Sequence, residues 1–311
     1  MTRELPWDRN VAVFCRDERW SIARCIESIA AASVGRRVLT TLIVNGSTDD
    51  SAAVALDAAR RLAVPLVVWS IPHGDKANAI NQFIYRLREP AASYIFLDAY
   101  VKIGPSAFTA LEECFATRPA AMAATGVAIN GRTMRDHMLP TLNEGGRLHG
   151  QLHALRPDFI GRFVARKLSI PIGLYYGDGL MGSMAMHDLD PVNIEWGQWR
   201  IASSPIATYE IPELSPFRGR DLRRQFHRKV RQMRGRLENL AIRSIVYDSG
   251  YEGLPEYADD MVNAYLSAHG PPRVAGLDRI FQSLAIRQMR AQPRPGAKDL
   301  EAVAIDRTEG A

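Results

Sequence analysis

The sequence has little cysteine and no long apolar run. Its three cysteines, Cys15, Cys25 and Cys114, include no Cys-x-x-Cys pair, so neither a disulfide framework nor a zinc knuckle is indicated, and we expect reduced thiols. No window approaches the roughly 18 to 20 uninterrupted apolar residues that span a bilayer, which restricts any membrane contact to the periphery. The segment 1–10 also lacks an apolar stretch of signal-peptide length. We therefore expect a cytoplasmic protein.

The bulk composition excludes a disordered or fibrous chain. With 311 residues, of which 47% are hydrophobic, the chain can bury a core in one large domain or two small ones. The net charge of +5 favours anionic partners, which include nucleotides, sugar phosphates, lipids and nucleic acids. Charge alone does not choose among them.

Short β-rich runs alternate with amphipathic stretches along residues 10–97, which is the rhythm of βαβ units. Such continuous apolar runs predict a parallel sheet covered by helices on both faces, with the ligand at the carboxyl ends of the strands. The expected strands are 10–15, 38–44, 65–69 and 93–97, and the expected helices are 21–33, 50–62 and 76–88.

The remaining chain divides by composition. A helix at 105–117 and a strand at 121–128 continue the pattern, and a further strand is expected at 206–211. Arginines crowd the chain beyond residue 216, and proline, glycine and charge dominate its end. The expected divisions are an α/β half at 1–128, a second half of the same domain at 129–215, a basic helical region at 216–291 and a disordered tail at 292–311.

The first polar motif, 45–50, follows the second expected strand and opens a helix. Asn45 can hydrogen-bond the edge of a base, Gly46 allows a tight turn, and Asp49 caps the helix. An ordinary turn with a good N-terminal cap explains the same residues.

Two further motifs suit a diphosphate. Lys76 stands at the start of a helix, where its charge and the helix dipole favour phosphate, although a solvated lysine is the ordinary alternative. Asp98 stands at the end of the fourth expected strand, where a carboxylate can coordinate Mg²⁺ or Mn²⁺ that bridges the phosphates. A turn-forming aspartate is the alternative there.

The fourth motif, 175–181, holds a carboxylate between two glycines. Asp178 could accept the proton of an attacking hydroxyl in a partly enclosed site. The alternative is a cap at the start of a short helix.

In order and spacing, these four motifs resemble family 2 glycosyltransferases of the GT-A fold, over roughly 10–180. Residues 11–18 are similar to that family's first strand and loop, 45–50 to its N/D-G-S-T-D turn, 74–81 to its G-K-x-x-A-x-N helix start, and 97–101 to its L-D-x-D-V metal motif. The resemblance implies a Rossmann-like, mostly parallel sheet with helices on both faces. It makes 1–128 the half that binds a nucleotide sugar and 129–215 the half that faces the acceptor.

The resemblance also implies roles. Asn45 would contact the base, Lys76 the diphosphate, Asp98 the metal or ribose, and Asp178 would be the general base of an inverting transfer from a UDP- or GDP-sugar to a glycan or lipid-linked acceptor. The nucleotide-sugar-binding set so implied is Arg16, Glu18, Asn45, Asp49, Lys76, Asn81, Asp98 and Tyr100. The family further suggests a part in cell-envelope polysaccharide synthesis.

Residues 225–229 are similar to the Q-x-x-R-W motif of the polymer-forming branch of the family. By that likeness Gln225, Arg228 and Lys229 would bind the diphosphate or the acceptor. Lys229 replaces the tryptophan that would stack on a sugar, which argues against processive synthesis. A basic helix with a chance match is the alternative.

Tyr100 departs from the family pattern, because it stands where the metal motif has its second aspartate. Tyrosine is a poor ligand for Mg²⁺, so a metal would depend on Asp98, phosphate oxygens and water. Three alternatives stay open: weak activity, activity without metal, and a catalytically silent protein that still binds nucleotide. Without metal, the basic segment could balance the diphosphate charge.

The basic helix carries an apolar stripe and admits two interpretations. It could lie on anionic lipid at the inner face of the cell membrane, near a lipid-linked acceptor, or it could pack on the catalytic domain. Nucleic acid is not an expected partner, because few aromatic residues accompany the arginines. A homo-oligomer is compatible with the sequence, which does not define one. The stripe consists of Leu222, Phe226, Val230, Met233 and Leu237.

Overall fold

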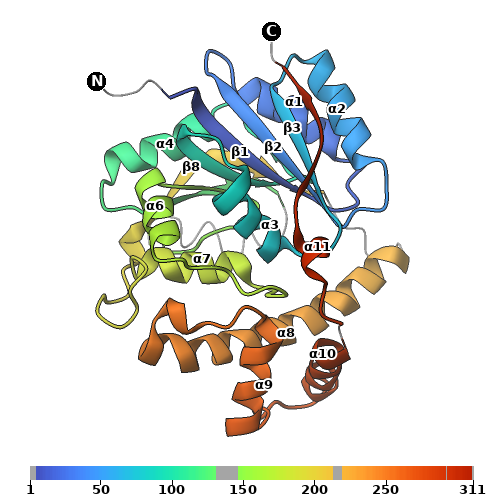
Figure 1. Cartoon of the computed structure of the whole chain (residues 1–311), viewed down its shortest axis with the longest axis vertical. Coiled ribbons are helices and arrows are strands. Elements are labelled where there is room, and N and C mark those ends of the chain that lie inside the picture. The colour runs from blue at the N-terminus through green and yellow to red at the C-terminus, as the bar shows by residue number, and fades with distance from the viewer. Residues whose placement is uncertain (1–4, 131–145, 213–218, 292, 310–311) are drawn as a thin grey trace.

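A computed structural model describes residues 5–130, 146–212, 219–291 and 293–309, with backbone alone for 219–228. One mixed sheet forms the upper part of the molecule, helices cover both of its faces, and a layer of helices lies below (Figure 1). This is the α/β fold expected from the sequence.

Within the described residues, the sheet has nine strands in the order β5-β8-β6-β7-β4-β1-β2-β3-β9. Strands β4, β1, β2 and β3 pair in parallel, as the apolar runs predict, whereas β7 and β9 are antiparallel to their neighbours. The strands are β1 (Trp7–Cys15), β2 (Val38–Asn45), β3 (Leu66–Ile71), β4 (Ala91–Asp98), β5 (Lys102–Ile103), β6 (Ala123–Ala128), β7 (Leu152–Leu155), β8 (Ile201–Glu210) and β9 (Val303–Thr308).

Side chains of the central strands alternate between two hydrophobic clusters, one on each face. On β1, Val11 and Val13 join the cluster under α1 (Ile22–Ala32), α2 (Ser51–Arg61) and α4 (Ala107–Thr117). Ala12 and Phe14 join the cluster on the opposite face. The helical elements packed there are α3 (Lys76–Gln82), the π-helical turn η1 (Phe83–Leu87), α6 (Pro157–Ala165) and α7 (Gly177–Met186).

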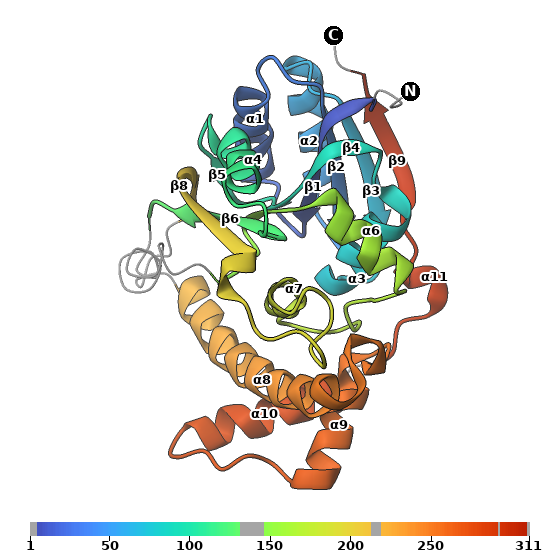
Figure 2. The ribbon, with the colours of Figure 1, turned by 90° about the vertical axis from the view of Figure 1, so that its left-hand side faces the viewer.

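The helical layer below the sheet is built around one long helix, α8 (Gly219–Ser249), which passes beneath α7 (Figure 2). None of the helices within the described ranges is long and apolar enough to cross a membrane. The shorter elements of this region are η3 (Gln198–Arg200), η4 (Tyr251–Gly253), α9 (Ala258–His269), α10 (Asp278–Ala291) and α11 (Ala297–Leu300).

The apolar stripe of α8 packs inside the protein wherever its side chains are described. Val230 and Met233 form a cluster with Ala285 of α10, and Leu237 belongs to the main core. The stripe residues Val230, Met233 and Leu237 are at most 4% exposed, which matches the packing interpretation of the stripe. Leu222 and Phe226 lie outside the described side chains.

The expectation of a disordered tail at 292–311 is wrong for residues 293–309. This segment forms α11 and then β9, which pairs antiparallel with the edge of β3. The Thr308 hydroxyl donates to the Val64 carbonyl at 2.7 Å and accepts from the Leu66 amide at 3.1 Å. An open sheet edge supplied the partner that composition does not reveal.

Candidate functional site

The candidate site lies where β1, β2 and β4 end. Asn45 is the last residue of β2 and Asp98 the last of β4, while Lys76 opens α3 after β3. Gly46 has a φ of +66°, and a Cβ there would lie 2.5 Å from the Cα of Gly74. The turn after β2 therefore contacts the segment before Lys76, so two of the motifs meet at this edge of the sheet.

Asp98 is the centre of a polar cluster. The Lys76 ammonium donates to its Oδ1, and the Tyr100 hydroxyl donates to its Oδ2 at 2.9 Å. Lys76 Nζ also lies 3.3 Å from the Gly150 carbonyl oxygen. Asp98 itself is buried, so its negative charge is stabilised mainly by the hydrogen bonds from Lys76 and Tyr100.

Burial raises the pKa of the Tyr100 hydroxyl, and the negative charge of Asp98 raises it further. The hydroxyl thus keeps its proton and remains a donor to the Asp98 carboxylate.

Asp178 approaches the same cluster from α7. The Gly179 amide donates to its Oδ1 at 3.0 Å, and a Cβ added to Gly150 would lie 2.7 Å from its Oδ2. The carboxylate therefore rests against the backbone of Gly150, whose carbonyl oxygen accepts from Lys76. A side chain at position 150 would press on the Asp178 carboxylate, and Lys76, Asp98 and Asp178 converge around this glycine.

The other nucleotide-binding candidates make contacts that build the edge of the site. The amide oxygen of Asn45 accepts from the Asp75 backbone N–H at 2.8 Å, and Asn45 is buried. The Asn81 amide makes both of its hydrogen bonds with the backbone of Ile170, at 2.8 and 2.9 Å. Asn45 thus holds the start of α3, and Asn81 ties α3 to the segment before α7. Their contact with a nucleotide stays a prediction.

The loop after β1 and the turn after β2 are hydrogen-bonded to each other at this edge. The Asp49 carboxylate accepts from the backbone N–H of Arg19 at 3.1 Å and of Ser51 at 3.0 Å. The N-terminal cap position of α2 is Asp50, one residue later than the sequence predicts, and the Asp50 side chain makes no capping hydrogen bond. Arg16 is exposed and donates to the Gly74 carbonyl at 3.2 Å, while the Ser21 hydroxyl donates to the Glu18 carboxylate. Of the candidates Arg16, Glu18 and Asp49, Arg16 is the exposed one, whereas the other two are half-buried.

The segment 225–229, which is similar to the Q-x-x-R-W motif, is only partly described. The side chains of Gln225 and Arg228 lie outside the described residues, and Lys229 is exposed on α8. Further along α8, the Arg231 guanidinium lies 5.7 Å from the ring centroid of Tyr175. The basic helix therefore reaches the loop that precedes α7, the helix that carries Asp178.

Sequence reasoning missed the residue that joins α8 to this loop. The Glu238 side chain is fully buried and accepts from the backbone N–H of Tyr175 at 3.0 Å and of Tyr176 at 3.4 Å. Arg234 donates to it at 2.7 Å through Nε and to the Gly173 carbonyl through Nη2. Burial raises the pKa of Glu238, against the lowering by Arg234. No local pattern reveals this cap, since its partners are more than 60 positions away.

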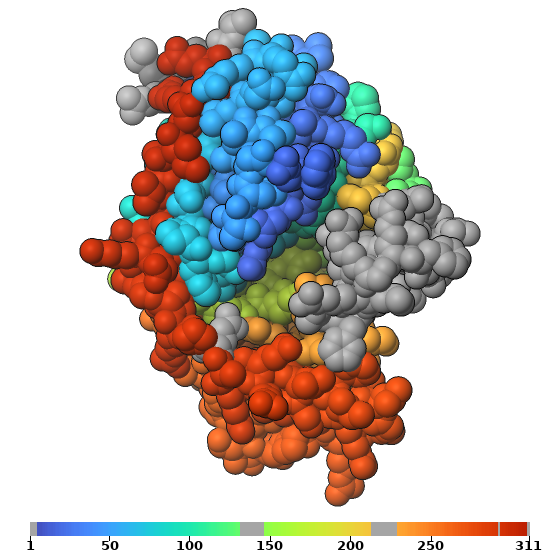
Figure 3. Space-filling view, turned by 90° about the vertical axis from the view of Figure 1, so that its right-hand side faces the viewer, coloured from blue at the N-terminus to red at the C-terminus, as the bar shows by residue number. Residues whose placement is uncertain are grey.

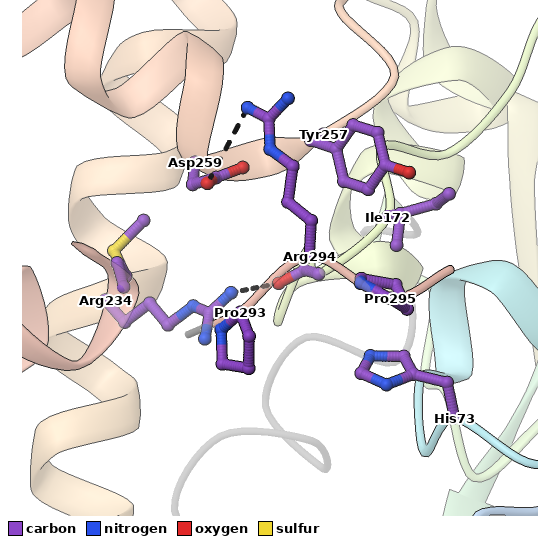
Figure 4. Close-up of a pocket in the computed structure, with 10 residues that line it drawn as sticks. His73, Ile172, Arg234, Tyr257, Asp259, Pro293, Arg294 and Pro295 are labelled. Carbon is purple, nitrogen blue, oxygen red and sulfur yellow. Dashed lines mark hydrogen bonds and ion pairs between the residues drawn. The ribbon is translucent and has the colours of Figure 1, made fainter. Parts of the chain in front are cut away.

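A small cavity lies behind Arg234, at the junction of α9, α10 and the 293–295 segment (Figure 4). Its volume is about 30 Å³, which holds one or two waters but no sugar nucleotide. Arg234 donates to the Gly173 carbonyl, and Figure 4 shows Arg294 pairing with Asp259. We interpret the cavity as a small gap in the packing between the helical layer and the sheet.

The donor set around Asp98 does not fit a divalent cation. Both carboxylate oxygens are engaged by hydrogen-bond donors, and Tyr100 is a neutral phenol. Within the described ranges, no group of three or more His, Cys, Asp or Glu side chains could hold a metal ion. A cation at Asp98 would share the two carboxylate oxygens with the Lys76 ammonium and the Tyr100 hydroxyl.

Comparison with known proteins supports the fold. No protein-family model matches the chain, and curated protein sequences give no match. Among solved structures, a mannosyltransferase from Pyrobaculum calidifontis in complex with GDP-mannose and Mn²⁺ is similar over 93% of this chain and 76% of its own, with a TM-score of 0.58 and 18% identity. TarS from S. aureus is similar over 91% and 80%, with a TM-score of 0.52 and 13% identity. A mycobacterial protein is similar over 76% and 74%, with a TM-score of 0.52 and 18% identity.

These likenesses give the class: the chain has the GT-A fold of glycosyltransferases. At 13 to 18% identity they define the fold alone, and function must be argued from the site.

Proposed function

We propose that the protein is an inverting glycosyltransferase that moves a sugar from a nucleotide diphosphate donor to a hydroxyl acceptor. The observation that carries the proposal is the convergence of Lys76, Asp98 and Asp178 around Gly150, at the strand ends of a GT-A fold. Ligands of open α/β sheets bind at this edge.

The charges suit a direct displacement. The ammonium of Lys76, whose side chain is 39% exposed, can neutralise the departing diphosphate. Asp178 is partly exposed and can accept the acceptor hydroxyl's proton. The acceptor oxygen then bonds to the anomeric carbon as the bond from that carbon to the diphosphate breaks, and a single displacement inverts the anomeric centre.

The donor class is a further part of the proposal. A UDP- or GDP-sugar is the donor we propose, and a similar mannosyltransferase was solved with GDP-mannose. A glycan or lipid-linked sugar is the proposed acceptor, reached from the side of α8, where Arg231 and Tyr175 meet. Work at the inner face of the cell membrane remains part of this proposal.

The decisive variant is Asp178→Asn. It removes the base but keeps the shape of the side chain, so donor hydrolysis and transfer should fall by at least about a hundredfold. Affinity for the nucleotide diphosphate should stay within about twofold, because Asp178 makes no bond to the leaving group in this scheme. Turnover is measured across a panel of UDP- and GDP-sugars, and affinity by calorimetry.

A matched control is Asp158→Asn, an exposed aspartate paired with Arg156 on the surface. It should leave both quantities unchanged. Normal turnover by Asp178→Asn would remove Asp178 from the mechanism. Nucleotide binding by the wild type without hydrolysis or transfer of any donor would instead identify a silent nucleotide-binding protein, the alternative that Tyr100 raises.

A further inference from the structure

The ammonium of Lys76 is a cation that the protein itself supplies to the site. The Lys76 ammonium donates to Asp98 Oδ1, to the Gly150 carbonyl at 3.3 Å, and lies 5.6 Å from the ring centroid of Phe14. Three fixed groups thus hold one charge at the end of β4. An ammonium has three N–H donors, and these contacts with oxygen use two. The third N–H is left for a phosphate oxygen on the exposed side.

The negative charge of Asp98 is balanced by the positive charge of Lys76. Two carboxylates would balance the charge of a divalent cation. The L-D-x-D-V metal motif, to which residues 97–101 are similar, would provide two. Here Tyr100 takes the second position, so one carboxylate faces one ammonium. With Asp178 counted as well, a divalent cation added to Lys76 and the two carboxylates would leave one unbalanced positive charge in a partly buried site before any ligand arrives.

Tyr100 fixes that arrangement. Its hydroxyl donates to Asp98 Oδ2 at 2.9 Å and so engages the oxygen that Lys76 does not use. The Asp98 backbone is held as well, because its N–H donates to the Gln151 carbonyl at 3.2 Å. The carboxylate has little freedom to turn toward another partner.

We propose that the Lys76 ammonium, oriented by Asp98 and Tyr100, takes the place of a divalent cation, so that the protein binds a nucleoside diphosphate without metal. The inference rests on the proposed function, since it assumes that a diphosphate occupies this edge. It makes Tyr100 a positioning residue, which acts through Asp98 on the ligand-contacting lysine.

Calorimetry with UDP and GDP tests the proposal on the full chain. Titrations are run with excess EDTA and, separately, with excess MnCl₂. For the nucleotide that binds, the two dissociation constants should agree within about threefold. Binding only with Mn²⁺ would overturn the proposal and leave the glycosyltransferase function standing. Failure of both nucleotides to bind under either condition would overturn the function and the inference together.

Substitution of the lysine tests which group supplies the charge. Lys76→Met keeps the aliphatic chain and should weaken binding in EDTA by about tenfold or more, because a charge-assisted contact is lost. The control is Lys102→Met, which removes a lysine of similar exposure, 44%, from its pair with Glu210. Wild-type affinity of Lys76→Met in EDTA, with an unchanged melting temperature, would overturn the role of Lys76.

Substitution of the tyrosine gives a result that a merely structural role would not. Tyr100→Asp creates a second carboxylate beside Asp98, so binding should weaken in EDTA and recover with Mn²⁺ by about tenfold or more. Tyr100→Phe keeps the ring without creating a ligand, and its affinity should be equally insensitive to EDTA and Mn²⁺. If Tyr100→Asp shows the same insensitivity, Tyr100 does not decide the metal dependence of this site and the positioning role falls.

Discussion

His153 is a buried histidine on β7 beside the charged cluster. Its ring stacks on Phe96 with 4.9 Å between ring centroids, and its Nδ1 lies 3.0 Å from the His149 carbonyl oxygen. Burial lowers the pKa of His153 to about 3, and the charge of Lys76 lowers it in the same direction. The ring is therefore neutral in the folded protein at neutral pH, and it adds no second positive charge next to Lys76.

This shift predicts a dependence of stability on pH. An unfolded histidine takes up a proton near pH 6.5, whereas folded His153 does so only near pH 3. Its contribution is complete above about pH 6.5 and is lost as the pH falls toward about 3, since the unfolded chain then binds more protons. His153→Phe keeps the stacking and removes the titration, so between about pH 7 and pH 5 its unfolding free energy should fall by about 2 kcal/mol less than that of the wild type.

Urea denaturation at a series of pH values measures this difference. The control is His269→Phe, because His269 is exposed and stacks on Tyr265 at the surface. The control should follow the wild-type curve. An identical pH slope for His153→Phe and the wild type would contradict the assignment.

At the scale of elements, the joint between α7 and α8 decides where Asp178 stands. Glu238 of α8 receives the Tyr175 and Tyr176 amides just before α7 begins at Gly177. A carboxylate at this end also interacts favourably with the dipole of α7. The basic helix, whatever it binds, is thereby connected to the proposed base.

Glu238→Gln should disturb this joint without removing its bulk. One carboxylate oxygen becomes an NH₂ group, which must face either Arg234 or the Tyr175 amide, and both are donors. We expect a loss of about 1 to 3 kcal/mol in stability. Asp178 should also shift, lowering kcat by about tenfold while the KM for the donor changes little.

Steady-state kinetics and urea denaturation test both effects. Glu252→Gln makes the same change in the exposed pair with Arg166 and should be nearly neutral. A change in donor KM with an unaltered kcat would mean that Glu238 acts on donor binding instead of on the base.

The elements that the sequence predicts are those with local signals. The strands around 10–15 and 38–44 are buried runs between turn residues, and the structure extends them only to Trp7–Cys15 and Val38–Asn45. The expected helix at 76–88 is a short helix that continues as a π-helical turn, a change that apolar periodicity does not register.

The site was predictable only in part, for the same reason. Lys76, Asp98 and Asp178 lie at strand or helix ends, where a sequence can be searched for polar residues. The contact of Gly150 with Asp178 depends on a chain crossing that no spacing encodes. Asn45 shows the converse, because a residue chosen for a base edge also holds the Asp75 amide, a contact that the sequence does not indicate.

At the scale of the whole molecule, the C-terminal segment links the helical layer to the sheet. Figure 3 shows it running along one edge of the molecule, from the helices below to the top of the sheet. Arg294 pairs with Asp260 of α9, and the Leu300 carbonyl accepts from Asn78 of α3 at 2.8 Å. The segment then becomes β9. Its composition resembles that of a disordered tail. The partners that order it are distant in sequence, so composition does not reveal them.

The stabilising part of β9 is its backbone. Most of its side chains are exposed, and the Arg60–Asp306 pair is a surface ion pair of small value. The ladder with β3 and the buried Thr308 hydroxyl remain as the main contributions.

A chain that ends at Glu301 should therefore unfold at lower urea concentration, with a loss of about 3 kcal/mol or more, since several buried hydrogen bonds disappear together. Removal of β9 also leaves the edge of β3 open, and an open edge pairs with other chains. Size-exclusion chromatography at rising protein concentration should show association of the truncated chain. A chain that ends at Glu309 keeps β9 and serves as the control. If the two truncated chains shared one urea midpoint and one elution profile, β9 would be an accessory strand and not the closing edge of the sheet.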